Sequence, residues 1–208
     1  MHTLNLHFFC WAQAGVTLES TLAVSWSLHL SGSTPTPETE LVVQLNQGWT
    51  WISLNVEAAD MQLSTVLGGI ALQGGDHVKN QQSFTDYYQG FGFFGQLLTM
   101  TTGEMYALQL ASASTLRFRG TPTPLPKTIS LASGWTFLPC PYQGSVSLSD
   151  GAPVFGYAQG DMLKSQALFA EFYAGFGFYG TLTMLEPGFG YKAKVSVGGI
   201  GTFQSSRR

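Results

Sequence analysis

Residues 75–95 read GDHVKNQQSFTDYYQGFGFFG, and residues 160–180 read GDMLKSQALFAEFYAGFGFYG. The two stretches align without a gap at an offset of 85 positions. Self-similarity at a fixed period is the signature of a repeated structural unit. The chain is therefore predicted to contain two tandem copies of one unit of about 85 residues.

The similarity extends beyond these stretches and sets the domain boundaries. Upstream, Leu45–Trp51 matches Leu131–Phe137 at an offset of 86, so one residue has been lost from the middle of the second copy. We assign the first unit to residues 41–120 and the second to residues 127–205. Residues 121–126 are a Pro-rich connector between them.

Residues 1–40 form a divergent N-terminal segment. Residues 15–33 resemble the end of a unit, and Thr34–Pro37 matches Thr121–Pro124 at the start of the connector. We interpret this segment as the remnant of an upstream repeat, which makes the chain part or descendant of a longer array. The alternative is a signal sequence, because Leu4–Trp11 is apolar and an Ala-Gln-Ala triplet follows it, although no Lys or Arg precedes it.

Apolar periodicity predicts strands. After Gly48, the residues Thr50, Ile52, Leu54 and Val56 alternate along the chain with Trp49, Trp51, Ser53 and Asn55. A period of two is expected of a half-buried strand, and similar runs suggest five or six short strands per unit. Asp60 can cap a short helix that carries Leu63, Val66 and Leu67. The predicted fold is all-β, with two tandem β-sandwich-like units and one short helix in each.

The composition limits the classes of partner. Charged residues are 10% of the chain against 44% apolar residues, and the net charge is −3. This balance argues against nucleic-acid binding, and no apolar run is long enough for a membrane span. Little charge is left to protect sheet edges, which favours association through edges or aromatic side chains. Cys10 and Cys140 could pair, but two separate small hydrophobic residues are the preferred interpretation.

The glycine-aromatic motif of each copy satisfies G-x-G-x-x-G, but a strand-like run follows it instead of the helix that a dinucleotide site needs. We interpret it as a glycine-kinked aromatic strand. Core packing is preferred to ligand stacking for its rings, namely Phe91, Phe93, Phe176 and Phe178. Trp49 and Trp135 are likewise interpreted as core anchors, with a stacking platform for carbohydrate as the alternative.

Four polar residues recur at equivalent places: Lys79, Gln81, Lys164 and Gln166. The period of two puts Lys79 and Gln81 opposite Val78 and Phe84. A repeated cation and amide could hydrogen-bond a sugar or a neighbouring subunit. The preferred interpretation is a solvated polar face or one that lies between the repeats.

Nothing in the sequence has the spacing of a catalytic or metal site. The four histidines (His2, His7, His29 and His77) are scattered, and His77 corresponds to Met162 in the second copy. G-x-S-x-G and H-E-x-x-H motifs are absent from the sequence. We therefore expect a protein that is not an enzyme and that needs no cofactor and no metal.

The series Gly-Trp-Thr-Trp-Ile-Ser-Leu-Asn-Val, Gly-Asp-x-x-Lys-x-Gln, Gly-Phe-Gly-Phe-Phe-Gly and Gly-x-x-Tyr resembles a tandem Gly-Trp β-repeat of bacterial surface and algal proteins. It is also similar to the paired β-domains of diatom pyrenoid shell proteins. The resemblance covers residues 41–205 and implies assembly into sheets around a carbon-fixing compartment. The second copy departs from it at Leu138–Pro141, where two prolines are expected to end the strand or place it at an edge.

Together these features predict a structural or interaction module that self-associates or joins a larger assembly. Its expected partners are copies of itself or other repeat-bearing chains. The alternative is a carbohydrate-binding module that uses the aromatic, Lys and Gln side chains. An extracellular, surface or organelle-associated assembly is favoured over the free cytosol.

Overall fold

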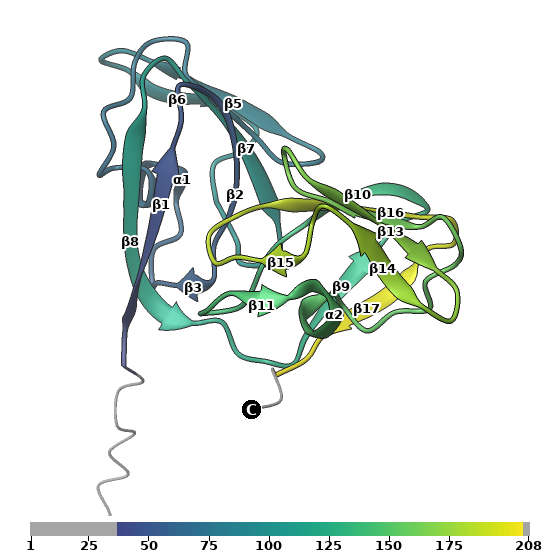
Figure 1. Cartoon of the computed structure of the whole chain (residues 1–208). Coiled ribbons are helices and arrows are strands. Elements are labelled where there is room, and N and C mark those ends of the chain that lie inside the picture. Colours follow the sequence, from purple (N-terminus) through teal and green to yellow (C-terminus); the bar gives the residue numbers. More distant parts are fainter. Residues whose placement is uncertain (1–36, 206–208) are drawn as a thin grey trace, which may run out of the picture. The chain divides into compact units, whose positions relative to one another are not determined.

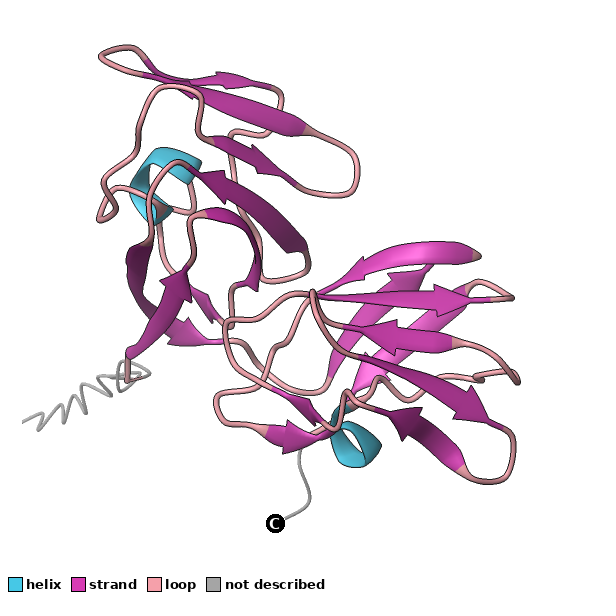
Figure 2. Ribbon diagram, turned by 45° about the horizontal axis from the view of Figure 1, so that its top comes forward, coloured by secondary structure: helices cyan, strands magenta, loops and turns pink. Residues whose placement is uncertain are grey.

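The computed structural model describes residues 37–205 and is built almost entirely from antiparallel strands (Figures 1 and 2). Seventeen strands and two four-residue helices are present in this range. The all-β prediction is confirmed. The predicted N-terminal remnant, the alternative signal sequence and Cys10 lie outside the described residues.

The first five-stranded sheet has the order β2-β7-β4-β5-β6. Its strands are β2 (Gly48–Ser53), β7 (Met105–Leu110), β4 (His77–Lys79), β5 (Phe84–Tyr88) and β6 (Gly92–Gly95). A second layer has the order β1-β8-β3, with bounds Thr39–Leu45, Ser114–Pro122 and Val56–Glu57. Both layers contribute to one apolar core, in which Leu45, Ile52 and Leu108 are fully buried. Two sheets that bury alternate side chains against each other form a sandwich-like arrangement.

The second five-stranded sheet has the order β10-β16-β12-β13-β14. Its strands are β10 (Gly134–Leu138), β16 (Tyr191–Val195), β12 (Met162–Lys164), β13 (Phe169–Tyr173) and β14 (Gly177–Gly180). Two pairs complete this half: β9 (Lys127–Leu131) with β17 (Gly199–Phe203), and β11 (Val146–Ser147) with β15 (Met184–Leu185). A separate core contains Leu131, Leu163 and Phe203.

The two five-stranded sheets follow the same order of corresponding strands and have the same register. His77 lies opposite Asp86 and Gln109, and Met162, 85 positions later, lies opposite Glu171 and Lys194. The unit boundaries at residues 41–120 and 127–205 stay a prediction. The expected five or six strands per unit are too few, since residues 39–122 contain eight strands and residues 127–203 contain nine. Two-residue strands such as β3, β11 and β15 account for part of the difference, because they leave no periodic pattern in the sequence.

The predicted helix is α1 (Leu63–Val66), and Leu63 and Val66 are its buried residues. Its N-cap is Gln62 rather than Asp60. The Asp60 carboxylate still supports the first turn, since it accepts hydrogen bonds from the Gln62 N–H (2.9 Å) and the Thr65 hydroxyl (2.6 Å). The second helix, α2 (Leu148–Gly151), has Ser147 as its N-cap.

The prolines act in two ways. β10 ends at Leu138 and is an edge strand, as expected from Pro139 and Pro141. The predicted connector at residues 121–126 is only partly a connector, because Thr121 and Pro122 continue β8 and lie opposite Glu57 and Val56. A proline fits there because β1 pairs with β8 only as far as Gly120, so Pro122 has a partner strand on one side only.

Candidate functional site

The glycine-aromatic motif forms the turn and the outer strand of a hairpin at one edge of each five-stranded sheet. Gly90 and Gly92 have φ angles of 80° and 91°, and Gly175 and Gly177 have φ angles of 82° and 94°. This left-handed conformation favours glycine and turns the chain at Phe91 and Phe176. Those two rings are 80% and 77% exposed, so the core-packing interpretation is wrong for them.

Phe93 and Phe178 behave differently, because they lie on β6 and β14 beyond the turn. Each packs partly buried against the core of its half. Phe93 also meets Tyr87 edge to face at 5.2 Å between ring centroids, and Phe178 meets Phe172 at 5.3 Å. Core packing therefore describes this pair, and the four phenylalanines divide between two sides of the hairpins.

The outward sides of the two hairpins carry matching sets of exposed aromatic rings. We call these the first aromatic face (Phe84, Tyr88, Phe91 and Phe94) and the second aromatic face (Phe169, Tyr173, Phe176 and Tyr179). Their members lie 85 positions apart. The expected pairing of Phe84 with Val78 on one side of the sheet is wrong: Phe84 lies opposite Lys79 and is exposed, whereas Val78 is buried.

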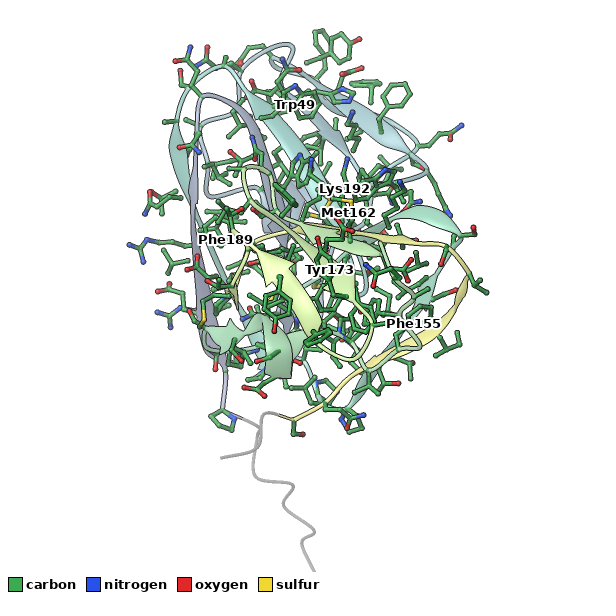
Figure 3. All side chains as sticks on the ribbon, turned by 45° about the vertical axis from the view of Figure 1, so that its right-hand side comes forward. Trp49, Phe155, Met162, Tyr173, Phe189 and Lys192 are labelled. Atoms are coloured by element: carbon green, nitrogen blue, oxygen red, sulfur yellow. The ribbon has the colours of Figure 1, made fainter. Side chains whose placement is uncertain are left out.

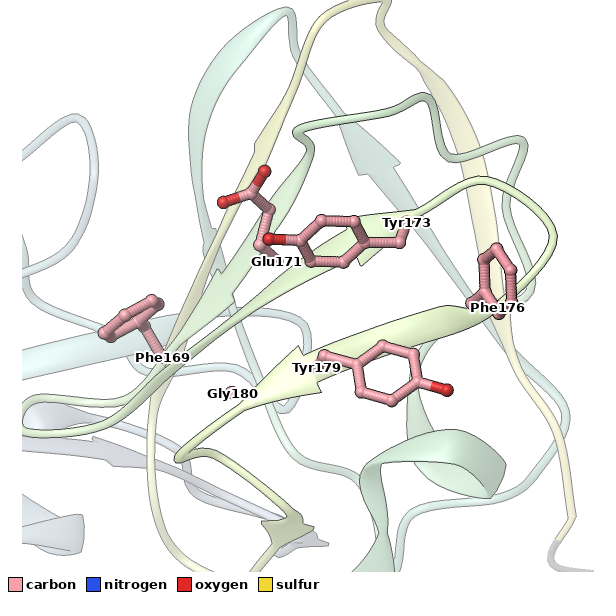
Figure 4. Close-up of a pocket in the computed structure, with 6 residues that line it drawn as sticks. All are labelled: Phe169, Glu171, Tyr173, Phe176, Tyr179 and Gly180. Atoms are coloured by element: carbon pink, nitrogen blue, oxygen red, sulfur yellow. The ribbon is translucent and has the colours of Figure 1, made fainter.

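A carboxylate lies among the rings of each aromatic face. Asp86 lies opposite Phe94, and its Oδ1 is 2.6 Å from Nδ1 of His77. Glu171 lies opposite Tyr179 on β14 and opposite Met162 on β12. The residue that corresponds to Met162 in the first sheet is His77, so Glu171 has no histidine partner there. Glu171 and the four rings of the second aromatic face line an open pocket (Figure 4). Alternation along β5 and β13 is the signal that could have located these carboxylates.

No further strand pairs with the outer edges of the two five-stranded sheets among residues 37–205. In the described part of the chain, β6 pairs only with β5 and β14 pairs only with β13. Each edge strand approaches its neighbour closely at a glycine, since a Cβ atom on Gly95 would clash with Phe84 O and one on Gly180 with Phe169 O. Such edges present backbone groups that another chain can pair with.

The opposite edges, β2 and β10, are covered by the repeated glutamines. The Gln81 amide donates to Trp135 O (2.9 Å) and accepts from the Phe137 N–H (2.6 Å). The Gln166 amide donates to Trp49 O (2.8 Å) and accepts from the Trp51 N–H (3.1 Å). Each sheet therefore supplies a glutamine that caps the edge of the other. This geometry supports the interpretation of a polar face between the repeats.

We expect Gln81→Ala and Gln166→Ala each to lower the free energy of unfolding by about 1 kcal/mol, because each change removes two partly exposed hydrogen bonds. Chemical denaturation followed by circular dichroism measures the change. Gln82→Ala is the matched control, since only the backbone of Gln82 is hydrogen-bonded, to Asn80. Equal stability of Gln81→Ala and Gln82→Ala would contradict the edge-capping role.

The tryptophans lie on the same outward side as the lysines and are not core anchors. Trp49 is half-buried and Trp135 is 41% exposed, whereas Thr50 and Thr136 point into the protein. The Lys79 ammonium lies 4.7 Å from the Trp49 ring centroid, and the Lys164 ammonium lies 5.6 Å from that of Trp51. These distances are typical of cation–π contacts. Trp49 is labelled in Figure 3.

Other chemistry is limited in the part of the chain that the structure describes. No three His, Cys, Asp or Glu side chains between residues 37 and 205 lie close enough together to hold a metal ion. Cys140 is buried, and burial raises the pKa of its thiol to about 12. A buried thiol of this kind is inert.

Comparisons with known proteins add no further assignment. No protein-family model, curated protein or solved structure matches the chain. Within residues 37–205, no helix has the length and apolar character required to cross a membrane.

Proposed function

We propose that this chain is a non-enzymatic structural module made of two repeated units, and that it self-associates through its two aromatic faces. One observation carries the proposal: both aromatic faces lie on hairpins whose outer strands pair with no further strand among residues 37–205, while the glutamines cap the other edge of each sheet. Clusters of exposed rings on a protein with so little charge favour association with another apolar surface.

A second copy of the chain is the occupant that fits best. Each copy offers two aromatic faces, so every chain could contact two neighbours. The faces differ at two places. The first contains the His77–Asp86 pair where the second contains Glu171 beside Met162, and the first contains Phe94 where the second contains Tyr179. In a contact between a first and a second aromatic face, the Glu171 carboxylate of one chain meets the first aromatic face of the other chain. It does not meet a second Glu171 carboxylate. Repeated contacts of this heterologous kind produce rings or open filaments.

Mass measurement by light scattering over a range of protein concentrations tests this proposal. The average mass of the wild-type chain is expected to rise with concentration. Phe91→Asp and Phe176→Asp each disable one face by placing a charge on an exposed turn, so either variant alone is expected to remain monomeric. An equimolar mixture of the two variants is expected to stop at dimers, because one intact face of each kind remains.

Val197→Asp is the matched control, because Val197 is 73% exposed but lies outside both aromatic faces. It is expected to associate as the wild type does. If each single variant formed dimers by itself, the contact would join two identical aromatic faces. The proposed contact between a first and a second face would then be wrong. A wild-type chain that stays monomeric at the highest concentration would overturn the proposal.

The second aromatic face supports one alternative, carbohydrate binding. Rings of Tyr173 and Tyr179 around the Glu171 carboxylate could stack on sugar C–H groups and accept their hydroxyl hydrogen bonds. Calorimetric titration with a panel of soluble oligosaccharides distinguishes this function from assembly. Binding that is lost in Glu171→Ala and kept in Asp86→Ala would favour the alternative.

A further inference from the structure

Three lysine side chains gather where the two five-stranded sheets meet. Lys79 comes from β4, Lys164 from β12 and Lys192 from β16, and all three are half-buried. The Lys192 ammonium lies 4.3 Å from the Trp51 ring centroid and 4.5 Å from that of Phe137. The Lys164 ammonium lies 5.6 Å from the same Trp51 ring centroid, so the two ammonium groups lie beside one ring. Figure 3 labels Lys192 on the ribbon.

No carboxylate compensates this charge in the described part of the chain. The ion pairs found between residues 37 and 205 join His77 to Asp86, and Arg117 and Arg119 to Glu40. The aromatic rings attract the ammonium groups but do not neutralise them. Desolvation lowers the pKa of Lys192, and the positive charges of Lys164 and Lys79 lower it further. Like charges that are held together in this way favour the binding of an anion.

The packing between the two five-stranded sheets does not require Lys192. In the second sheet Lys164 lies opposite Lys192, whereas in the first sheet Lys79 lies opposite Ala107, the residue 85 positions before Lys192. The glutamine caps are present on both sides. Alanine is therefore compatible with this register, and Lys192 adds charge that the packing does not need.

We propose that Lys79, Lys164 and Lys192 form a site for a compact oxyanion, namely phosphate or sulfate, free or as an ester. An ammonium group carries three N–H donors. A ring occupies one side of each group, which leaves donors for oxygen atoms of the ligand. Charge-assisted hydrogen bonds of this kind are about twice as strong as neutral ones.

Titration of the full chain with inorganic pyrophosphate, followed by tryptophan fluorescence, tests the site. Saturable quenching or enhancement is expected, because the ligand draws the ammonium groups away from the Trp49, Trp51 and Trp135 rings. Lys192→Ala is expected to weaken binding about tenfold, the effect of roughly one lost charge-assisted contact. The variant should fold normally because the first sheet carries alanine at the corresponding position. Added salt should weaken binding to the wild type.

Lys194→Ala is the matched control, since it removes the same charge two residues further along β16, where the side chain is exposed. Equal loss of affinity in Lys192→Ala and Lys194→Ala would show a diffuse charge effect and overturn the site. So would an absence of pyrophosphate binding at millimolar concentration. A parallel titration with a sulfated oligosaccharide identifies the source, because tighter binding than pyrophosphate indicates an ester on a polymer and weaker binding indicates the free ion.

Discussion

Gly190→Val is expected to lower the free energy of unfolding by about 3 to 5 kcal/mol, because it forces a side chain into a backbone contact. A Cβ atom at Gly190 would lie 2.8 Å from Ile52 O and 3.1 Å from Ile52 N, and it would overlap the side chain of Met105. The hydrogen bond from the Gly190 N–H to Trp51 O (3.1 Å) would be lost as well. Chemical denaturation followed by tryptophan fluorescence measures the change.

The size of the effect depends on what this contact joins. The loop that precedes β16 lies along the edge of β2: the Ser53 N–H donates to Gly188 O (3.0 Å), and the Ser53 hydroxyl donates to Phe189 O (2.7 Å). The Ser53 hydroxyl also accepts from the Cys140 N–H (2.9 Å). Ser53 is fully buried, so displacement of the loop would leave several backbone groups without partners in the interior.

Gly144→Val is the control for Gly190→Val. Gly144 has no neighbouring atom within 4 Å of a built Cβ, and its φ angle is not in the left-handed region. Its replacement is expected to change stability by no more than about 0.5 kcal/mol. If the two valine variants proved equally stable, the backbone contact between the loop and β2 would be refuted.

The sequence predicted the buried side of β2 correctly only as far as Ile52, where burial follows the alternation of a strand. Thr50 and Ile52 are buried and Trp49 and Trp51 are half-buried, but Ser53 and Asn55, expected on the other side, are buried as well. The assignment of Trp49 to the core failed for a related reason. The outward side of a strand is not always solvent. This one faces the other sheet, whose Lys164 and Lys192 lie over the Trp51 ring and whose Gln166 donates a hydrogen bond to Trp49 O. Composition gives no indication of that long-range neighbour.

Local pattern alone also could not place the site residues. Phe91 and Phe93 share one side of an extended strand, but the positive φ angles of Gly90 and Gly92 separate them. Lys192 has no basic counterpart in the first copy, so a search for repeated residues passes over it. Only the register of β12 with β16 brings it to Lys164. The partners of Gln81 are more than 50 positions away, and no periodicity encodes them.

Asp161→Ala is expected to lower the free energy of unfolding by about 3 kcal/mol, because the change removes a buried carboxylate that accepts three hydrogen bonds. Asp161 is 3% exposed. Its carboxylate accepts from the Ala158 N–H (2.9 Å), the Ser196 N–H (2.8 Å) and the Ser196 hydroxyl (3.0 Å). It therefore ties the turn before β12 to the end of β16. Thermal and chemical denaturation both report the loss.

Two comparisons separate this role from a general effect of removing an acidic side chain. Asp76, 85 positions earlier, accepts only from the Gln73 and Ala111 N–H groups, both at 2.8 Å, so Asp76→Ala is expected to cost less than Asp161→Ala. Asp150 is exposed and accepts from the Ser147 hydroxyl, and its replacement by alanine is expected to cost less than about 1 kcal/mol. If Asp161→Ala were as stable as Asp150→Ala, the carboxylate would not hold the strand ends together, because the three donors would then find other acceptors without cost.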